Sequence, residues 1–265
     1  MADQAETAAF GSDRGGVGKS KAAELRISRH FLQHGKLPTI VEVEADPRLS
    51  LVYGQDNVKL FRIAQDRLVD IERDPSLVYR TWDAIGEVCM GSKAPVVLDI
   101  GANLTRTFAM WLNEYGEDGP FGAGAPLNFF GVTTGDALAV RSLNQALGYV
   151  AQAVPDSRRF ILINERDARF PLASDAPVIK EMAKAHGVRG VLRMPACMSP
   201  GLAHVVDRHM RLDAAAAMDA AAWERACRFP RLEAVRAQRR MVSFLDDGVR
   251  AFDAAYGPVA DAVPA

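Results

Sequence analysis

A glycine-rich stretch near the N-terminus, residues 12–20, constrains the fold of this chain more than any other feature. It reads Ser-Asp-Arg-Gly-Gly-Val-Gly-Lys-Ser, and its glycines let the backbone turn several N–H groups towards one point. If a helix begins at the lysine, these N–H groups, the helix N-terminus, the Lys19 ammonium and the Ser20 hydroxyl together suit the phosphates of a nucleotide and its Mg²⁺. The motif therefore predicts a strand before residue 12 and a helix after residue 18.

Short apolar runs separated by helix-like segments continue this pattern along the chain. The predicted strands are 8–10, 39–43, 96–100, 129–133, 160–163 and 188–194. The predicted helices are 19–34, 76–90, 135–154, 176–186, 201–209 and the alanine-rich 214–222. Such alternation predicts an α/β fold with a mostly parallel central sheet and helices on both faces. Residues 114–126 are expected to form a surface loop, and residues 260–265 a frayed tail.

Composition narrows the class of protein. A chain of 265 residues with 49% hydrophobic content is the usual size of a single α/β domain, and its net charge of −1 argues against a uniformly basic nucleic-acid binder. The three cysteines lack the spacing of a disulfide framework or a zinc site. No signal peptide or membrane-spanning run is found, so we expect a cytoplasmic protein that does not attach to a membrane.

Carboxylates follow two of the predicted strands. Asp99 lies near the end of the strand 96–100, and Glu44-Ala-Asp46-Pro-Arg48 follows the strand 39–43. Hydrolysis of a γ-phosphate requires a positioned water and stabilisation of charge, so acidic groups beside a phosphate-binding loop are expected in an NTPase.

The glycine-rich loop departs from the strict P-loop pattern, because Asp13 stands where that pattern has a glycine. The run from Arg14 to Ser20 instead resembles the deviant Walker A motif Lys-Gly-Gly-x-Gly-Lys-Ser/Thr of the ParA/MinD family of ATPases, with Arg14 in place of the first lysine. This resemblance covers about residues 7–210 and implies a single-domain P-loop NTPase fold over 1–265, with 211–265 as a helical C-terminal extension. It implies that ATP is bound by Arg14, Gly15, Gly16, Val17, Gly18, Lys19, Ser20, Asn164 and Pro195.

The same resemblance implies roles in catalysis and metal binding. Residues 44–48 are similar to the family signature Asp-x-Asp-Pro-Gln, with Glu44 and Arg48 as departures and Asp46 on the water-activating aspartate. Asp46, Lys19 and Arg14 are the implied catalytic residues, Arg14 by reaching across an ATP-sandwiched dimer. Mg²⁺ would be held by Ser20 directly and by Asp99 and Asp46 through water. Asp99-Ile-Gly-Ala also looks like the corresponding segment of TraL-type conjugation proteins.

The function that this resemblance implies is slow ATP hydrolysis coupled to an ATP-dependent homodimer and stimulated by an unidentified protein partner. Plasmid or DNA partition, conjugative transfer and cellular positioning are the processes it suggests. Two alternatives stay open. One is an ATP-dependent biosynthetic enzyme of the dethiobiotin or cobyrinic acid synthase type, and the other is a nucleotide-binding scaffold that does not hydrolyse ATP.

An arginine-rich segment lies near the C-terminus, at residues 223–240. Its six arginines against two glutamates give a local net charge of +4. The segment is interpreted either as a solvated helix face or as a surface that contacts the phosphates of DNA without sequence preference. The arginines are Arg225, Arg228, Arg231, Arg236, Arg239 and Arg240.

Overall fold

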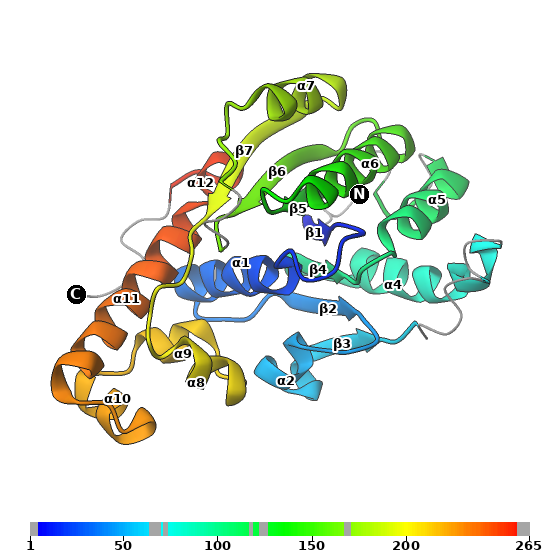
Figure 1. The fold of residues 1–265 in the computed structure, drawn as a ribbon. Coiled ribbons are helices and arrows are strands. Elements are labelled where there is room, and N and C mark those ends of the chain that lie inside the picture. Colours follow the sequence, from blue (N-terminus) through cyan, green and yellow to red (C-terminus); the bar gives the residue numbers. More distant parts are fainter. Residues whose placement is uncertain are drawn as a thin grey trace.

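The computed structural model describes residues 5–63, 70, 74–116, 119–121, 127–166 and 171–258. Its centre is one seven-stranded sheet in the order β3-β2-β4-β1-β5-β6-β7, and every pair of neighbouring strands is parallel (Figure 1). The strands are β1 Thr7–Gly11, β2 Thr39–Val43, β3 Val58–Phe61, β4 Val96–Ile100, β5 Leu127–Thr133, β6 Arg158–Asn164 and β7 Val188–Met194. Parallel strands bring their carboxyl ends to one edge of the sheet, and the candidate site lies there.

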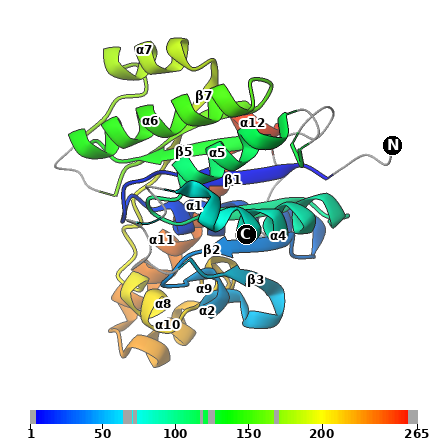
Figure 2. The same cartoon turned by 90° about the vertical axis from the view of Figure 1, so that its right-hand side faces the viewer.

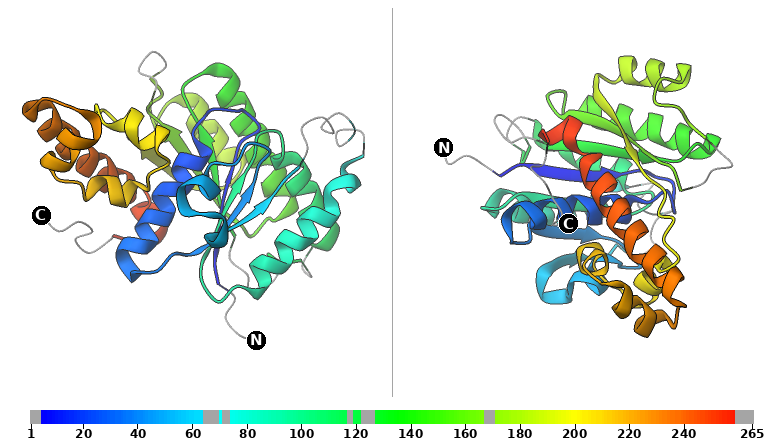
Figure 3. Two further views of the ribbon diagram at one scale, coloured as in Figure 1. Left: turned by 90° about the horizontal axis from the view of Figure 1, so that it is seen from below. Right: turned by 90° about the vertical axis from the view of Figure 1, so that its left-hand side faces the viewer.

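Helices cover both faces of the sheet. They are α1 Lys19–His34, α2 Leu49–Tyr53, α4 Tyr79–Gly91, α5 Thr105–Tyr115, α6 Ala137–Ala153, α7 Pro177–Ala185, α8 Leu202–Asp207, α9 Leu212–Ala216, α10 Ala220–Cys227, α11 Arg231–Arg250 and α12 Asp253–Tyr256. Short 3-10 helices lie at Gln55–Asn57 and Pro75–Val78. Seen from below, α1 and α11 lie on one side of the strands and α4, α5 and α6 on the other (Figure 3). The α/β fold predicted from the sequence is therefore confirmed.

Alternate residues of the strands pack into two separate hydrophobic cores. The core beneath α1 and α11 contains Phe10 and Phe130, whose rings stack with centroids 5.0 Å apart. The core beneath α4 to α7 is built around Phe129, Trp82 and other large side chains. Strands that are apolar on both faces in this way are typical of a parallel sheet covered twice.

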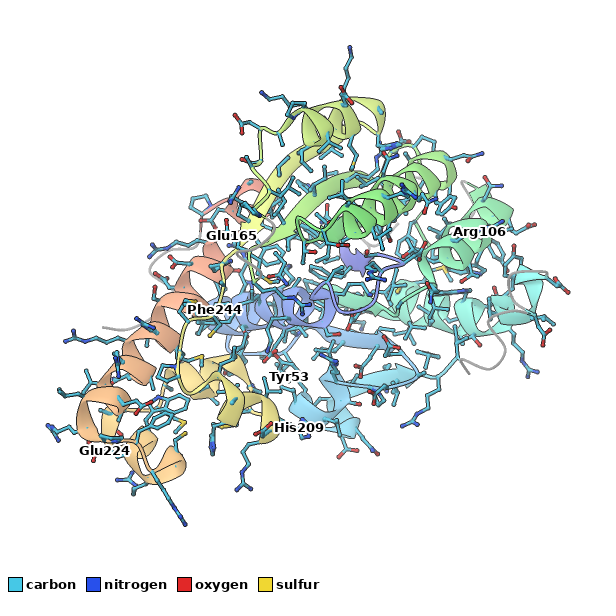
Figure 4. The ribbon with its side chains drawn as sticks, viewed as in Figure 1. Tyr53, Arg106, Glu165, His209, Glu224 and Phe244 are labelled. Atoms are coloured by element: carbon cyan, nitrogen blue, oxygen red, sulfur yellow. The ribbon has the colours of Figure 1, made fainter. Side chains whose placement is uncertain are left out.

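The C-terminal helices are packed into the first of these cores. Phe252 meets the rings of Phe10 and Phe130 edge-on, and the buried Arg29 of α1 donates to the carbonyl of Val249 at 3.0 Å and pairs with Asp253. Figure 4 labels Phe244 on α11, where this helix passes α1, and Glu224 on α10, which packs beside the N-terminal end of α11. In Figure 2 the helices α8, α9 and α10 gather at the opposite end of the molecule from α7.

Several sequence-based boundaries need correction. The predicted helix 214–222 is two helices, because Asp219 accepts a hydrogen bond from the Ala222 N–H and starts α10 afresh. The predicted loop 114–126 begins later, since α5 continues to Tyr115. The helix expected from residue 76 begins as a 3-10 turn, and its α-helical part starts at Tyr79.

The edge strand β3 and the helices α2 and α5 were not predicted from the sequence. Residues 117–118, 122–126 and 260–265 lie outside the described residues. Within the described residues, no helix is long and apolar enough to cross a membrane.

Candidate nucleotide-binding site

The glycine-rich loop connects β1 to α1, as the motif predicts. Gly16 and Gly18 have φ angles of 73° and 101°, which lie in the left-handed region that glycine adopts without strain. Gly18 is the N-cap of α1, and its carbonyl accepts the first helical hydrogen bond, from the N–H of Ala22 at 2.9 Å. Residues 12–18, which we call the phosphate loop, therefore end at a helix N-terminus, where free N–H groups favour an anion.

Two side chains from outside the phosphate loop hold it in place. Asn164, at the end of β6, donates from its amide nitrogen to the Val17 carbonyl at 2.8 Å. Its amide lies so close to Gly18 that a Cβ at this position would collide with it. On the other side, the Asp13 carboxylate accepts a hydrogen bond from the Thr105 N–H at 3.0 Å, at the start of α5. The loop is therefore fixed to β6 and to α5.

Lys19 is buried against this loop, with 7% of its surface exposed. Its ammonium donates to the Arg14 carbonyl at 3.3 Å, so the side chain folds back along the loop. Burial lowers the pKa of Lys19, and the negative charges of Asp99, Glu44 and Asp13 oppose this shift. A buried ammonium bound to a backbone carbonyl is suited to exchange that bond for bonds to phosphate oxygens.

Asp99 lies on β4 on the same face as Lys19 and is 3% exposed. One of its carboxylate oxygens, Oδ1, is buried without a hydrogen-bond partner in the described structure. Burial raises the pKa of Asp99 to about 7, an effect opposed by the Ser20 hydroxyl and the Lys19 ammonium. An unsatisfied buried oxygen beside a serine hydroxyl fits a hard cation with its water shell, as Mg²⁺ requires.

Within the described residues, no group of three or more His, Cys, Asp or Glu side chains could hold a metal ion by itself. A Mg²⁺ ion at Ser20 and Asp99 would thus depend on phosphate oxygens and waters for its remaining ligands.

The ends of β2 and β4 approach each other closely beside these residues. The Gly101 N–H donates to the Val43 carbonyl at 2.8 Å, and a Cβ at Gly101 would lie 2.6 Å from that oxygen. This approach brings Glu44 to the site, where its charge acts on both Lys19 and Asp99. Asp46, by contrast, is exposed and makes no hydrogen bond or ion pair with any described residue.

Glu42 is a site residue that the sequence analysis missed. Its carboxylate is fully buried on β2 and accepts backbone N–H groups from Arg48, Leu49 and Ser50, at 2.5, 2.8 and 2.9 Å. The available signal in the sequence was a charged residue inside the predicted strand Thr-Ile-Val-Glu-Val. A carboxylate buried in a strand needs hydrogen-bond donors, so its presence indicates that another segment supplies them.

The residues predicted to contact the base lie at the ends of β6 and β7. The Asn164 oxygen accepts a hydrogen bond from the Arg166 N–H at 3.1 Å, and its nitrogen bonds the phosphate loop, so both polar atoms are engaged. Pro195 is half-buried directly after β7, and the neighbouring Met194 carbonyl accepts from the Glu165 N–H at 3.0 Å. Asn164 borders the phosphate loop, and Pro195 follows Met194, whose side chain lies beside Gly18. Contact of Asn164 and Pro195 with a base stays a prediction.

The remaining predicted residues lie on the surface. Arg14 is exposed, and its guanidinium has no partner among the described residues. All six arginines of the segment 223–240 are exposed, on or between α10 and α11. The structure therefore brings together the phosphate loop, Lys19, Ser20, Asp99 and Glu44, and it leaves Arg14, Asp46 and the arginine-rich segment facing solvent.

Comparisons with known proteins give only distant structural likenesses. No protein-family model and no curated protein matches the chain. The chain is similar to the MinD cell division protein of Aquifex aeolicus, with 12% identity over 90% of this chain and 98% of that chain and a TM-score of 0.43. A MinC:MinD cell division protein complex of the same organism gives 11% identity over 90% and 96%, with a TM-score of 0.43. A plasmid partition protein from Borrelia burgdorferi gives 13% identity over 72% and 90%, with a TM-score of 0.39. At such identities and TM-scores, these likenesses assign neither family nor function to the chain.

Proposed function

We propose that this chain is an ATPase of the ParA/MinD type, which binds Mg-ATP on the phosphate loop and hydrolyses it slowly. The observation that carries the proposal is the phosphate loop itself. It turns through two left-handed glycines into the N-terminus of α1, with a buried lysine folded along it. This combination provides N–H donors and positive charge at one point, which is the requirement for binding a polyphosphate.

The residues around the phosphate loop are proposed to contact the phosphates, Mg²⁺ and the base. Lys19 exchanges its bond to the Arg14 carbonyl for oxygens of the β- and γ-phosphates. Ser20 and, through water, Asp99 hold Mg²⁺, which neutralises phosphate charge when bound. The unsatisfied Oδ1 of Asp99 supports this assignment, because it is buried yet free to accept. Asn164 and Pro195 border the adenine.

Hydrolysis is assigned to the loop after β2. Asp46 is proposed to orient the attacking water and to contact Mg²⁺ through water, as the resemblance implies. Its exposure agrees with a group that must face a substrate, and Glu44 adds a second carboxylate nearer to Lys19. Positioning and charge stabilisation are the main protein contributions to phosphoryl transfer, so slow basal turnover is expected until a partner completes the site.

We further propose that ATP joins two copies of the chain in a sandwich dimer. Arg14 is the residue suited to cross the interface, since its guanidinium is exposed, always charged and unpaired in the described structure. A cytoplasmic role in plasmid or DNA partition, conjugative transfer or positioning of a cargo would follow from such a switch. The exposed arginines of α10 and α11 would contact DNA phosphates, and an unidentified protein would stimulate hydrolysis.

The test combines phosphate release with molar mass by light scattering, using the full chain, Asp46→Ala and Arg14→Ala. Asp46→Ala should bind ATP, lose turnover and have twice the mass of one 28.8 kDa chain with Mg-ATP but not with ADP. Arg14→Ala should bind ATP and stay monomeric. An Asp46→Ala protein that binds ATP as a monomer would contradict the dimer. Turnover that depends on a small organic acid would favour a biosynthetic enzyme, and binding without any turnover would favour a scaffold.

A further inference from the structure

A buried carboxylate on β2 holds the segment that carries the two candidate acids. Glu42 lies two residues before Glu44, is 0% exposed and makes all its hydrogen bonds to backbone N–H groups at the start of α2. Oε1 accepts from Arg48 and Leu49, and Oε2 accepts from Ser50. Because both oxygens already have N–H donors, Glu42 is suited to hold backbone in place and not to bind a ligand.

The three hydrogen bonds that Glu42 accepts from residues 48–50, which we call the tether, replace an N-cap that α2 otherwise lacks. The N-cap residue of α2 is Arg48, whose side chain makes no capping hydrogen bond. A five-residue helix has almost no stability of its own, so its first turn depends on external acceptors for its free N–H groups. Among the described residues, Glu42 supplies the side-chain acceptor for three of them.

The tether also fixes the second end of a short loop. Residues 44–48 leave β2 where the Val43 carbonyl accepts from the N–H of Gly101, the residue after β4, and they re-enter regular structure at the N–H groups that Glu42 binds. Asp46 lies midway between these two fixed ends and has no hydrogen bond of its own to a described residue. Its position is therefore set by the ends of the loop.

The position of Glu42 in the sheet places the loop 44–48 next to Asp99, the proposed Mg²⁺ residue on β4. Glu42 on β2 is paired in register with Asp99 on β4, and paired residues of neighbouring parallel strands project from the same face. That face is the one covered by α1, because Ile40 and Val97, two residues earlier on each strand and therefore on the same face, belong to the core beneath it. Glu42 thus joins the loop of Asp46 to the strand of Asp99.

We infer that Glu42 is a positioning residue for hydrolysis, whose carboxylate holds the loop 44–48 in place, with Glu44 beside Lys19 and Asp46 exposed to the substrate. This inference rests on the proposed function. The residue acts through the loop, so losing it should lower turnover of bound ATP and leave ATP binding itself largely intact.

The experiment compares Glu42→Gln with Glu24→Gln. Glutamine has the shape of glutamate, but its amide NH₂ cannot accept the Ser50 N–H, so at least one of the three bonds is lost. Glu24, on α1, is also buried and bonds Lys21, so Glu24→Gln is the same change away from the loop. Circular dichroism confirms that both variants fold.

For Glu42→Gln we expect kcat to fall about tenfold or more while the Kd for Mg-ATP changes less than about threefold, as expected for loss of a charge-assisted hydrogen bond that acts on the loop. Glu24→Gln should change neither. A Glu42→Gln protein with parental kcat would overturn the inference, as would a loss of ATP affinity as large as the loss of turnover.

Amide hydrogen exchange in the nucleotide-free protein tests the tether independently of ATP. The N–H groups of residues 48–50 should exchange about tenfold faster or more in Glu42→Gln and at the parental rate in Glu24→Gln. Unchanged exchange would overturn the inference even if the protein is an ATPase. A parent protein with no turnover would contradict the proposed function, and the exchange rates would still decide whether Glu42 holds the loop.

Discussion

The side-chain amide of Asn164 donates a hydrogen bond to the Val17 carbonyl at 2.8 Å and thereby joins the end of β6 to the phosphate loop. The amide oxygen of the same residue accepts from the Arg166 N–H, and the side chain is buried. Asn164 is predicted from the sequence to contact adenine. In the structure both of its polar atoms are occupied by backbone partners, which gives it a second role as a brace for the loop.

Asn164→Ala distinguishes these two roles. If Asn164 braces the loop, the variant should lose about five- to tenfold in affinity for ATP and GTP alike, the loss expected for one hydrogen bond. If it reads the base, only ATP binding should weaken. Affinities measured with fluorescent analogues of both nucleotides give the answer. Asn144→Ala, which removes a side-chain bond to His186 elsewhere, should leave both affinities unchanged.

Asp13 provides the second brace, by accepting a hydrogen bond from the Thr105 N–H at 3.0 Å. Asp13→Ala leaves this N–H unpaired in a partly buried position and should lower the free energy of unfolding by roughly 1–2 kcal/mol. Asp13→Asn keeps an oxygen at the same place and should cost less than Asp13→Ala. Urea unfolding of both variants measures the difference. Equal losses would show that the charge of Asp13, not its hydrogen bond, stabilises the loop.

If the arginine-rich segment binds DNA, it should make the affinity for DNA depend on salt concentration. Four of its arginines have no partner in the described structure, and one of these, Arg228, has a left-handed backbone. Replacing the other three by glutamine removes charge without breaking a contact. They are Arg225, Arg236 and Arg239. If they contact DNA phosphates, the logarithm of the DNA-binding constant should depend less steeply on the logarithm of the salt concentration. The magnitude of that slope should fall by roughly 0.9 for each arginine removed.

A matched control removes three exposed positive charges on other elements. The control residues are Lys36, Arg80 and Lys93. Fluorescence anisotropy with a random-sequence duplex at several salt concentrations compares the two triple variants in the ATP-bound state. The same slope for both would assign the arginine-rich segment to a solvated helix face.

The burial of His30 predicts that the free energy of unfolding depends on pH. Burial, with Arg26 and His34 nearby, lowers the pKa of His30 to about 4 from an ordinary value of 6.5. Because the folded pKa is the lower one, the protonated imidazole favours the unfolded chain, and stability present above pH 6.5 is lost as the pH falls towards 4. His30→Gln should therefore reduce the loss between these pH values by on the order of 1–3 kcal/mol.

Denaturant unfolding at several pH values measures this effect. His209, whose backbone is left-handed, is exposed, and His209→Asn is the matched control because asparagine accepts that conformation. A parental pH profile in His30→Gln would show that the histidine is not the group that titrates.

Much of the fold could be predicted because strands such as β4 and β6 are built around short apolar runs, Val-Val-Leu and Phe-Ile-Leu-Ile, each followed within two residues by a polar side chain or a glycine. The elements that were missed carry weaker local signals. β3 is a four-residue edge strand with a lysine at its second position, and its pairing with β2 is a long-range contact. α5 follows Asn103, whose φ of 63° marks a turn, and its apolar residues Phe108, Trp111 and Leu112 have a helical spacing that the sequence analysis did not use.

The residues of the candidate site that belong to a local sequence motif could be predicted. Those whose role depends on contacts between distant segments could not. The phosphate loop and Asp99 follow from local sequence. The tether of Glu42, the brace of Asn164 and the bond between Asp13 and Thr105 depend on which segments meet in space, from 6 to 147 residues apart in the chain. The exposure of Asp46 beside a more central Glu44 likewise depends on how the loop after β2 is held.

The measurement that tests the central claim most directly is isothermal titration of ATP into the full chain and into Lys19→Ala, each with and without Mg²⁺. We predict that the parent binds one ATP per chain and that Lys19→Ala weakens binding at least about tenfold, since a buried charge-assisted contact to phosphate is lost. Asp99→Asn should remove only the part of the affinity that depends on Mg²⁺. Failure of the parent to bind ATP, or equal affinity in Lys19→Ala, would contradict the account.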